Sequence, residues 1–380
     1  MTLPGRFGIY SLAGCISLMS LLVLPAMVGV LVDESPLTEE QAGLAASIGF
    51  MGAAAIAFVM AFRMHRLDLR RTAMLAFLLA ALGDASSGFM VNHPALFMLI
   101  RFMTGVAGGA AYTAIVAAFA REKQVDRGYG IFITLQFIVS GLGLYLVPVY
   151  SPWLSVTGLY LIFAALDLAG SVLCHWLPGR AKLASAGKAL RSELSVLLAK
   201  ATLLGAMGFA LFEAANTAQF TYVERYGVAL QLSDHQVGLA MMIGSLAGIP
   251  GAFTIVLTGS RFGRSGPLTL GIVIAMIGLW VMISAGEFSA YLAGSVLLGF
   301  SWAFCLPFIQ GLLAALDRHG SAVAAGSASS TIGGAMGPGL AALIVSNENY
   351  HGVFYLAMVL FVLALGSFIF SSRETADAIN

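Results

Sequence analysis

Long apolar segments, separated by short polar connections, fill almost the whole chain. A helix needs about 20 mostly apolar residues to cross the hydrocarbon core of a bilayer. Segments of that kind lie at 9–32, 38–62, 72–91, 95–120, 128–149 and 156–177 and, after a polar interruption, at 200–223, 234–258, 267–286, 288–315, 322–345 and 351–371. The pattern predicts an all-α membrane protein with twelve transmembrane helices in two sets of six. The first apolar run is too long for a cleaved secretory leader, so we interpret it as a retained span.

The longest polar connection, 178–199, separates the two sets. It begins with Pro-Gly and carries several basic residues, which is typical of a linker. We therefore expect an N-terminal six-helix bundle over 1–177 and a C-terminal six-helix bundle over 200–380. The cytoplasmic linker between them, 178–199, could form an amphipathic surface helix.

The distribution of Lys and Arg predicts the orientation of the spans. Of the 19 basic residues, all except Arg101 and Arg225 fall in connections on one side or in the termini. Arg101 lies within a span, and Arg225 is expected in a connection on the opposite side. The positive-inside rule then places both termini in the cytoplasm of a multi-pass protein of the plasma (inner) membrane.

The composition indicates that lipid covers much of the protein's surface and is its main partner. Hydrophobic residues make up 59% of the chain and charged residues 10%, against roughly 25% charged in soluble domains. The net charge of +1 gives no indication of nucleic-acid binding. No Cys/His spacing suggests a metal site, and no phosphate-binding loop, dinucleotide motif or nucleophile elbow occurs. We therefore expect neither an enzyme nor a cofactor.

Two segments of the chain are nearly copies of each other. Residues 37–49 read LTEEQAGLAASIG and residues 232–244 read LSDHQVGLAMMIG, with seven identical positions at an offset of 195 (232 − 37). We infer that the two halves descend from one six-helix bundle, in the parallel orientation that an even number of spans requires. Thr38 and Ser233 are expected to cap the helices that follow them.

The connection after the second span of each half carries a basic loop motif. It reads AFRMHRLDLRR over 61–71 in the first copy, and the same register of the second copy keeps arginines around Gly263. Both copies resemble the G-x-L-A-D-R-x-G-R-R loop of the major facilitator superfamily of secondary transporters. His65 and Ser260 stand where that family has aspartate, so the resemblance implies a cytoplasmic gate that is weaker or built differently. It assigns gating to five arginines, Arg66, Arg70, Arg71, Arg261 and Arg264.

Two further motifs carry the same resemblance, which covers essentially the full length. Arg101 and Gly105 in the fourth span look like the family's R-x-x-x-G pattern, and GGAMGPG over 333–339 resembles its glycine-proline hinge. Gly337 and Pro338 are therefore further gating candidates. The antiporters of the family carry the hinge in the fifth span, so its place in the eleventh favours a bendable helix over antiport. The resemblance also implies alternating access, a small-molecule substrate and a monomer.

Four ionisable residues fall inside predicted spans, where charge is costly and most often functional: Asp84, Arg101, Asp167 and Glu213. Asp84 precedes the hairpin turn at His93 by nine residues and Arg101 follows it by eight, which places both ~12–14 Å below the turn. An ion pair is plausible. It would either pin two helices together or support an Arg101 that binds an anionic substrate group or competes with protons for a carboxylate, so Asp84 is also a proton-coupling candidate. Asp167 is expected to serve packing more than proton coupling.

Glu213, Asn216, Thr217 and Phe220 share one helical face by their spacing. A polar face at mid-membrane needs water, a partner helix or a substrate, so Glu213 is the leading proton-coupling candidate. The alternative is a neutral Glu213 that bonds a backbone carbonyl. In the superfamily the first helix of each triplet lines the cavity, so the resemblance implies that Arg101 and Glu213 face each other across it.

The substrate-binding candidates are polar or aromatic residues of the predicted spans, namely Arg101, Tyr112, Gln136, Asn216, Phe220, Trp302 and Gln310. The predicted function is secondary active transport of a small organic molecule, coupled to protons and directed to export by antiport. Uptake or exchange of a small organic anion is one alternative. A membrane sensor that does not transport is another.

Overall fold

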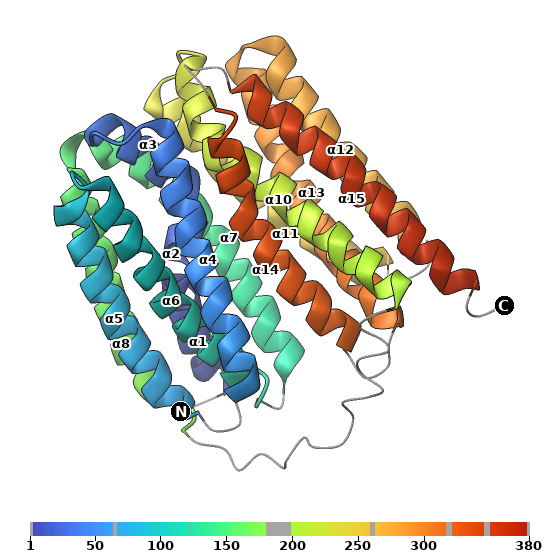
Figure 1. Ribbon diagram of the computed structural model, residues 1–380, viewed down its shortest axis with the longest axis horizontal. Coiled ribbons are helices and arrows are strands. Elements are labelled where there is room, and N and C mark those ends of the chain that lie inside the picture. The colour runs from blue at the N-terminus through green and yellow to red at the C-terminus, as the bar shows by residue number, and fades with distance from the viewer. Residues whose placement is uncertain are drawn as a thin grey trace. The chain divides into compact units, whose positions relative to one another are not determined.

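The computed structural model describes residues 3–63, 67–122, 124–179, 199–258, 263–316, 321–345 and 350–377. The chain forms two compact units, the N-terminal unit (Met1–Ala184) and the C-terminal unit (Ser185–Asn380). Helices make up nearly all of the described chain, and these ranges contain no strand (Figure 1). The all-α fold predicted from the sequence is confirmed. Most of the predicted linker, 178–199, lies outside the described residues.

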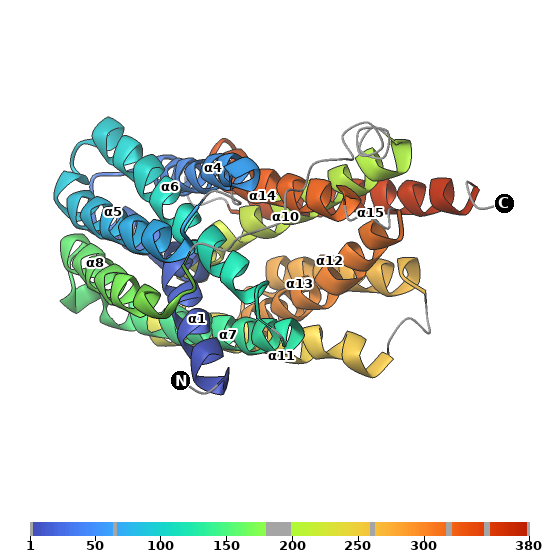
Figure 2. The same cartoon turned by 90° about the horizontal axis from the view of Figure 1, so that it is seen from below.

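The N-terminal unit contains the first six predicted spans as helices. The first span is α1 (Leu3–Ser17), α2 (Met19–Leu22) and α3 (Leu24–Glu34). The other five are α4 (Glu39–Arg63), α5 (Leu69–Met90), α6 (Pro94–Phe119), α7 (Val125–Tyr150) and α8 (Val156–Leu173), with the short 3-10 turns η2 (Ser151–Trp153) and η3 (Cys174–Trp176). α5 packs between α6 and α8, as both views show (Figures 1 and 2).

The first span is broken rather than continuous. Pro25 stands at the start of α3, and a proline has no N–H for the helical bond to the carbonyl four residues earlier. The backbone therefore leaves the helix at Val23, and it also does so at Leu18. Ser140 Oγ on α7 donates to the carbonyl of Leu22 at 2.6 Å. A side chain of a neighbouring helix thus satisfies a backbone group at the break.

The C-terminal unit contains the other six spans: α10 (Lys200–Ala229), α11 (Asp234–Thr258), α12 (Ser265–Ala285), α13 (Phe288–Leu316), α14 (Ser321–Ala342) and α15 (His351–Asp377). The expectation that Arg225 lies in a connection is wrong, because α10 continues to Ala229. Arg225 is 5% exposed. Its Nε lies 2.8 Å from Oε2 of Glu224, so the charge is paired within the helix end.

Not every span is apolar enough to cross a membrane by itself. Among the described residues, nine helices meet that standard by length and hydropathy: α4, α5, α6, α7, α8, α11, α12, α13 and α15. The broken first span is too short in each piece. α10 carries polar and charged side chains along its length, and α14 is rich in Ser and Gly. These two less apolar helices pack against each other.

The duplicated segment forms the same N-terminal cap in both units. Thr38 Oγ1 accepts from the backbone N–H of Gln41, and Gln41 Oε1 accepts from the N–H of Thr38, both at 3.2 Å. Ser233 and Gln236 repeat this arrangement at 3.3 and 3.0 Å. Each pair is a capping box, which satisfies two N–H groups that a helix start leaves open. The caps predicted at Thr38 and Ser233 are confirmed, and the identical glutamines are explained.

A glycine crossing also recurs in both units. Gly105 on α6 lies so close to Gly49 on α4 that an added Cβ would overlap the Gly49 carbonyl oxygen. Gly299 on α13 meets Gly244 on α11 in the same way. Small residues at such crossings let helix backbones approach closely in membranes. The second and fourth spans of each unit are therefore joined by the same backbone contact.

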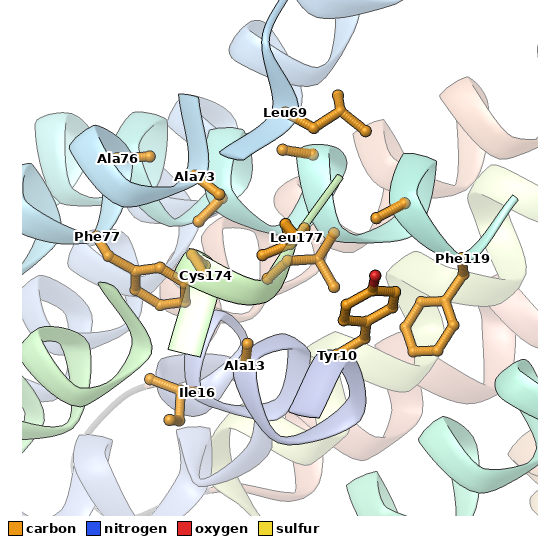
Figure 3. Packing of buried hydrophobic residues seen from close by; sticks show 14 of the residues in the cluster. Tyr10, Ala13, Ile16, Leu69, Ala73, Ala76, Phe77, Phe119, Cys174 and Leu177 are labelled. Carbon is orange, nitrogen blue, oxygen red and sulfur yellow. The ribbon is translucent and has the colours of Figure 1, made fainter. Parts of the chain in front are cut away.

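A hydrophobic cluster fixes α1 against α5, α6 and η3 in the N-terminal unit (Figure 3). Tyr10 packs edge-on against the ring of Phe119, with ring centroids 5.6 Å apart. Leu69 and Phe77 of α5 are fully buried in the same cluster. They begin a buried face of α5 that recurs every three or four residues and reaches Asp84. The cluster therefore holds the helix that carries this carboxylate.

Candidate functional site

Arg101 and Asp84 form a buried ion pair between α6 and α5. Asp84 lies on the buried face of α5, and Arg101 lies on the buried face of α6 that includes Phe97 and Thr104. Asp84 is 4% exposed and Arg101 8%. The pairing that the equal depths suggested is present. In a low-dielectric interior such a pair is tolerated only when further hydrogen bonds satisfy the remaining polar atoms.

The guanidinium of Arg101 has partners on three further sides. Ser87 Oγ accepts from Nη1 at 3.4 Å, and Ser20 Oγ accepts from Nη2 at 3.2 Å. Its Cζ lies 5.2 Å from the ring centroid of Tyr160 on α8, within the range of a cation–π interaction. An anion could reach this guanidinium only by competing with these partners and with Asp84.

Asp167 joins this cluster from α8. It lies on the buried face of α8 together with Tyr160 and Phe163, and it is 6% exposed. Its carboxyl group is close enough to that of Asp84 for a hydrogen bond when one of them carries a proton. The Oδ2 atom of Asp167 is buried and has no hydrogen-bond partner among the described residues. The structure thus brings together three of the four predicted intramembrane charges, whereas residue spacing predicts only the pair of Asp84 and Arg101.

The fourth intramembrane charge, Glu213, lies on α10 of the C-terminal unit. It is only partly buried, whereas its neighbours Phe212 and Ala214 are buried. Trp302 Nε1 on α13 donates to both of its carboxyl oxygens, at 3.3 and 3.4 Å. An indole N–H can only donate, so it supports an acceptor oxygen at this position. The alternative of a neutral Glu213 that bonds a backbone carbonyl stays a prediction.

The other polar residues on the Glu213 face bond to their own helix. Asn216 Nδ2 donates to the carbonyl of Phe212 at 2.8 Å, and Thr217 Oγ1 donates to that of Glu213 at 2.9 Å. Phe220 is partly exposed. Asn216 and Phe220 remain predicted substrate contacts, but the amide of Asn216 has less hydrogen-bonding capacity left for a ligand.

The remaining predicted substrate contacts lie in different surroundings. Tyr112 packs against the cluster of Figure 3, with its ring 6.3 Å from that of Phe132. Gln136 on α7 is partly exposed and Gln310 on α13 is exposed. Both glutamines stay predicted substrate contacts.

The predicted gating arginines that the structure describes lie at helix starts. Arg70 Nε donates to the carbonyl of Leu177 at 2.9 Å, which ties α5 to the end of η3. Arg71 is exposed, and its backbone N–H donates to Asp68, the N-cap of α5, at 3.0 Å. Arg264 is exposed and precedes α12. The two other predicted gating arginines, Arg66 and Arg261, lie outside the described residues.

Gly337 and Pro338 lie inside α14, which continues through them to Ala342. An added Cβ at Gly337 would overlap Oγ1 of Thr217 on α10, and one at Gly333 would overlap the carbonyl of Ala210. Both glycines therefore let α14 approach the helix that carries Glu213. The gating role of Gly337 and Pro338 stays a prediction.

Sequence reasoning did not connect Ser20, Ser87 or Tyr160 with Arg101. Ser20 and Tyr160 come from the first and sixth spans, and only tertiary packing brings them to Arg101. Ser87 could have been found, because it lies one turn from Asp84 on the same face of the helix. The Glu224–Arg225 pair was missed because α10 was expected to end near residue 223.

The chain was compared with known families and structures. The family model of the Major Facilitator Superfamily matches residues 9–316 and 226–379. No curated protein matches the sequence. A mutant of the nucleoside transporter NupG has a similar fold, with a TM-score of 0.80 at 14% identity, covering 97% of this chain and 100% of that one. NupG itself gives 0.76 at 14% identity, covering 98% and 100%.

A third solved structure is a bacterial homologue of the human lysosomal transporter Spinster, in an inward-facing and unoccupied conformation. It gives a TM-score of 0.73 at 11% identity and covers 99% of each chain. At these identities the similarity shows the fold alone. The family model, which spans almost the whole sequence, shows more: the chain belongs to the Major Facilitator Superfamily of transporters.

Proposed function

We propose that this membrane transporter exports a small organic molecule in exchange for protons, with Glu213 as the coupling group. The observation that carries the proposal is the position of Glu213, a partly exposed carboxyl in the middle of a span whose oxygens accept from Trp302. A carboxyl at that depth is costly to keep and is functional by default. Protonation and release at Glu213 would change the charge of α10 once in each cycle.

The surroundings of Glu213 favour an aromatic or amphipathic substrate. Trp302 and Phe220 are both partly exposed, and their ring faces can stack on a flat ligand or attract a cation. Export of such a molecule needs the substrate and the proton to compete for one carboxyl. The proposal therefore predicts that a bound substrate displaces the proton from Glu213.

The geometry gives less support to transport of an organic anion. That alternative needs Arg101 to offer N–H groups to a carboxylate or phosphate on the substrate. Three of the five N–H groups of Arg101 are engaged by Asp84, Ser20 and Ser87. An anion would have to leave the Asp84 carboxylate buried without its cation, which is strongly unfavourable.

The decisive experiment is proton flux in reconstituted vesicles that contain a pH-sensitive dye. Pools of amphipathic compounds and organic anions are added to wild type, to Glu213→Gln and to the control Glu287→Gln, which removes an exposed carboxylate beyond the spans. We expect substrate-dependent flux in wild type and in Glu287→Gln, and none in Glu213→Gln. The sign of the flux tests export against uptake.

Three results would contradict parts of this proposal. Substrate movement without proton movement in wild type would remove the coupling role of Glu213. Flux with the anion pool alone would favour the organic-anion alternative. If no pool produced flux while a known transporter worked in the same vesicles, the sensor that does not transport would be the better hypothesis.

Trp302→Phe is expected to weaken substrate-dependent proton flux by about ten- to a hundredfold. The change removes the N–H that donates to Glu213, and a hydrogen bond to a charged group is worth roughly 1.5–3 kcal/mol, where 1.4 kcal/mol is a factor of ten. Trp280→Phe is the matched control, because Trp280 is 60% exposed on α12. Initial rates over a range of substrate concentrations give the measurement. Equal loss in both variants would remove Trp302 from the mechanism.

The proposed orientation places both termini in the cytoplasm of the plasma (inner) membrane, with the protein working as a monomer. The burial of Arg225 strengthens the charge asymmetry, since the one basic residue assigned to the outer side is now paired inside α10. Reporter fusions at either end should be active only in the cytoplasm. Activity of such a reporter outside the cell would reverse the orientation.

A further inference from the structure

Two carboxyl groups and one guanidinium are buried together where α5, α6 and α8 meet. Asp84 pairs with Arg101, and Asp167 lies within hydrogen-bonding reach of Asp84. If both carboxyls were ionised, the cluster would hold two negative charges and one positive charge in a low-dielectric setting. Like charges this close are destabilising unless a proton or a second cation intervenes.

The hydrogen-bond inventory points to a proton. Oδ2 of Asp167 is buried without a partner among the described residues, and a buried acceptor that receives no hydrogen bond is costly. An ionised carboxyl can only accept hydrogen bonds, whereas a protonated one can also donate. A hydrogen on either group would turn the close approach of Asp84 and Asp167 into an O–H···O bond. It would also leave one anion against one cation.

We propose that Asp84 and Asp167 share one proton, so that the N-terminal unit has a protonation site of its own, with Arg101 as its fixed counter-ion. Asp84 holds the charge, because Arg101 bonds directly to it. Asp167 supplies the proton-bearing partner from α8. The bound species is a proton, and the site is distinct in the chain from Glu213, which belongs to the C-terminal unit.

The surroundings of the cluster contain few other groups that could titrate in its place. The charged groups that act on Asp167 are Asp84 and Arg101. The helices packed against α5 and α8 include α6, α1 and α3. The other titratable residues of these helices, of α8 and of η3 are Arg6, Tyr10, Cys15, Asp33, Glu34, Tyr112, Tyr160, Cys174 and His175. Tyr10, Cys15 and Cys174 belong to the hydrophobic cluster of Figure 3, and Asp33 and Glu34 end α3.

The consequence for transport rests on the proposed function, because it assumes coupling at Glu213. With a second protonation site, the N-terminal unit could gain or lose a proton as the pH changes. It could do so together with Glu213 of the C-terminal unit or separately from it. The proton itself does not depend on transport. It can be detected in the purified protein without substrate.

The test uses infrared spectroscopy of the purified full chain at pH about 7, where exposed carboxyls are ionised. A protonated carboxylic acid has a C=O band that carboxylates and amides lack. Glu213→Gln removes the other intramembrane acid. We expect the acid band to persist in Glu213→Gln, to shift in heavy water, and to vanish in Glu213→Gln/Asp167→Asn.

Asparagine at 167 mimics the protonated acid, since its amide can donate to Asp84. Asp167→Asn should therefore melt within about 2 °C of wild type, whereas Asp84→Asn should melt lower because Arg101 loses its charged partner. If the double variant does not fold, the band and its heavy-water shift in Glu213→Gln alone still test the proposal.

No acid band in Glu213→Gln, or a band that Asp167→Asn leaves unchanged, would overturn the shared proton. Neither result would touch the proposed function, which stands or falls on substrate-dependent flux. Conversely, loss of coupled flux in every variant would contradict the proposed function, and the infrared band would still test the shared proton.

Discussion

Arg101→Met is expected to destabilise the protein by about 3–5 kcal/mol, because it leaves the Asp84 carboxylate buried without its cation. This loss of stability arises because only one member of the ion pair is removed. Replacing both members of a buried pair by apolar side chains is often close to neutral, so Arg101→Met/Asp84→Leu should recover much of the loss. Chemical unfolding in mild detergent measures the difference between the single and double variants.

The matched control is Arg264→Met, which removes an exposed arginine at the start of α12. An exposed ion pair contributes at most about 1 kcal/mol, so this variant should unfold close to wild type. Equal stability of the Arg101 and Arg264 variants would mean that the buried pair contributes little. A double variant as unstable as Arg101→Met would mean that the guanidinium acts mainly through Ser20, Ser87 and Tyr160.

Gly105→Ala is expected to destabilise the N-terminal unit by about 1–3 kcal/mol or more, the usual cost of overpacking. The added Cβ would overlap the backbone of Gly49, and a backbone atom cannot move aside as a flexible side chain can. Gly299→Ala should have the same effect in the C-terminal unit, where Gly244 is the partner. Melting temperatures in detergent test both.

Gly366→Ala is the control, and its expected change in stability has the opposite sign to that of Gly105→Ala. Nothing lies within 4 Å of a Cβ added at Gly366 on α15. Alanine is favoured over glycine in a helix by roughly 1 kcal/mol, so this variant should be as stable as wild type or more stable. A loss at Gly366 equal to that at Gly105 would show that helix packing at the crossing is not the cause.

The spans, the caps and the Asp84–Arg101 pair could be predicted because each depends on local spacing. Apolar length predicts a span, and Thr38 with Gln41 is a short-range signal. Asp84 and Arg101 belong to one hairpin, so counting residues from its turn was enough to place them at one depth.

The position of Asp167 could not be predicted in the same way. It depends on which face of α8 packs against α5, and the small residues that decide this, such as Gly88 against Thr157, give no periodic signal. The bond between Glu213 and Trp302 joins helices far apart in sequence. Pro25 lies within an apolar run that is long enough for one continuous span, so the sequence did not predict a break there.

The contact between α10 and α14 has a consequence for how the chain is made. Neither helix is apolar enough to enter a membrane readily by itself, yet ribosomes deliver α10 well before α14 exists. During synthesis, α10 therefore lacks one of its packing partners until α14, which meets it at Gly333 and Gly337, has been made. We expect nascent chains stalled before α14 to keep α10 accessible to the cytoplasm and to be preferred targets of membrane proteases.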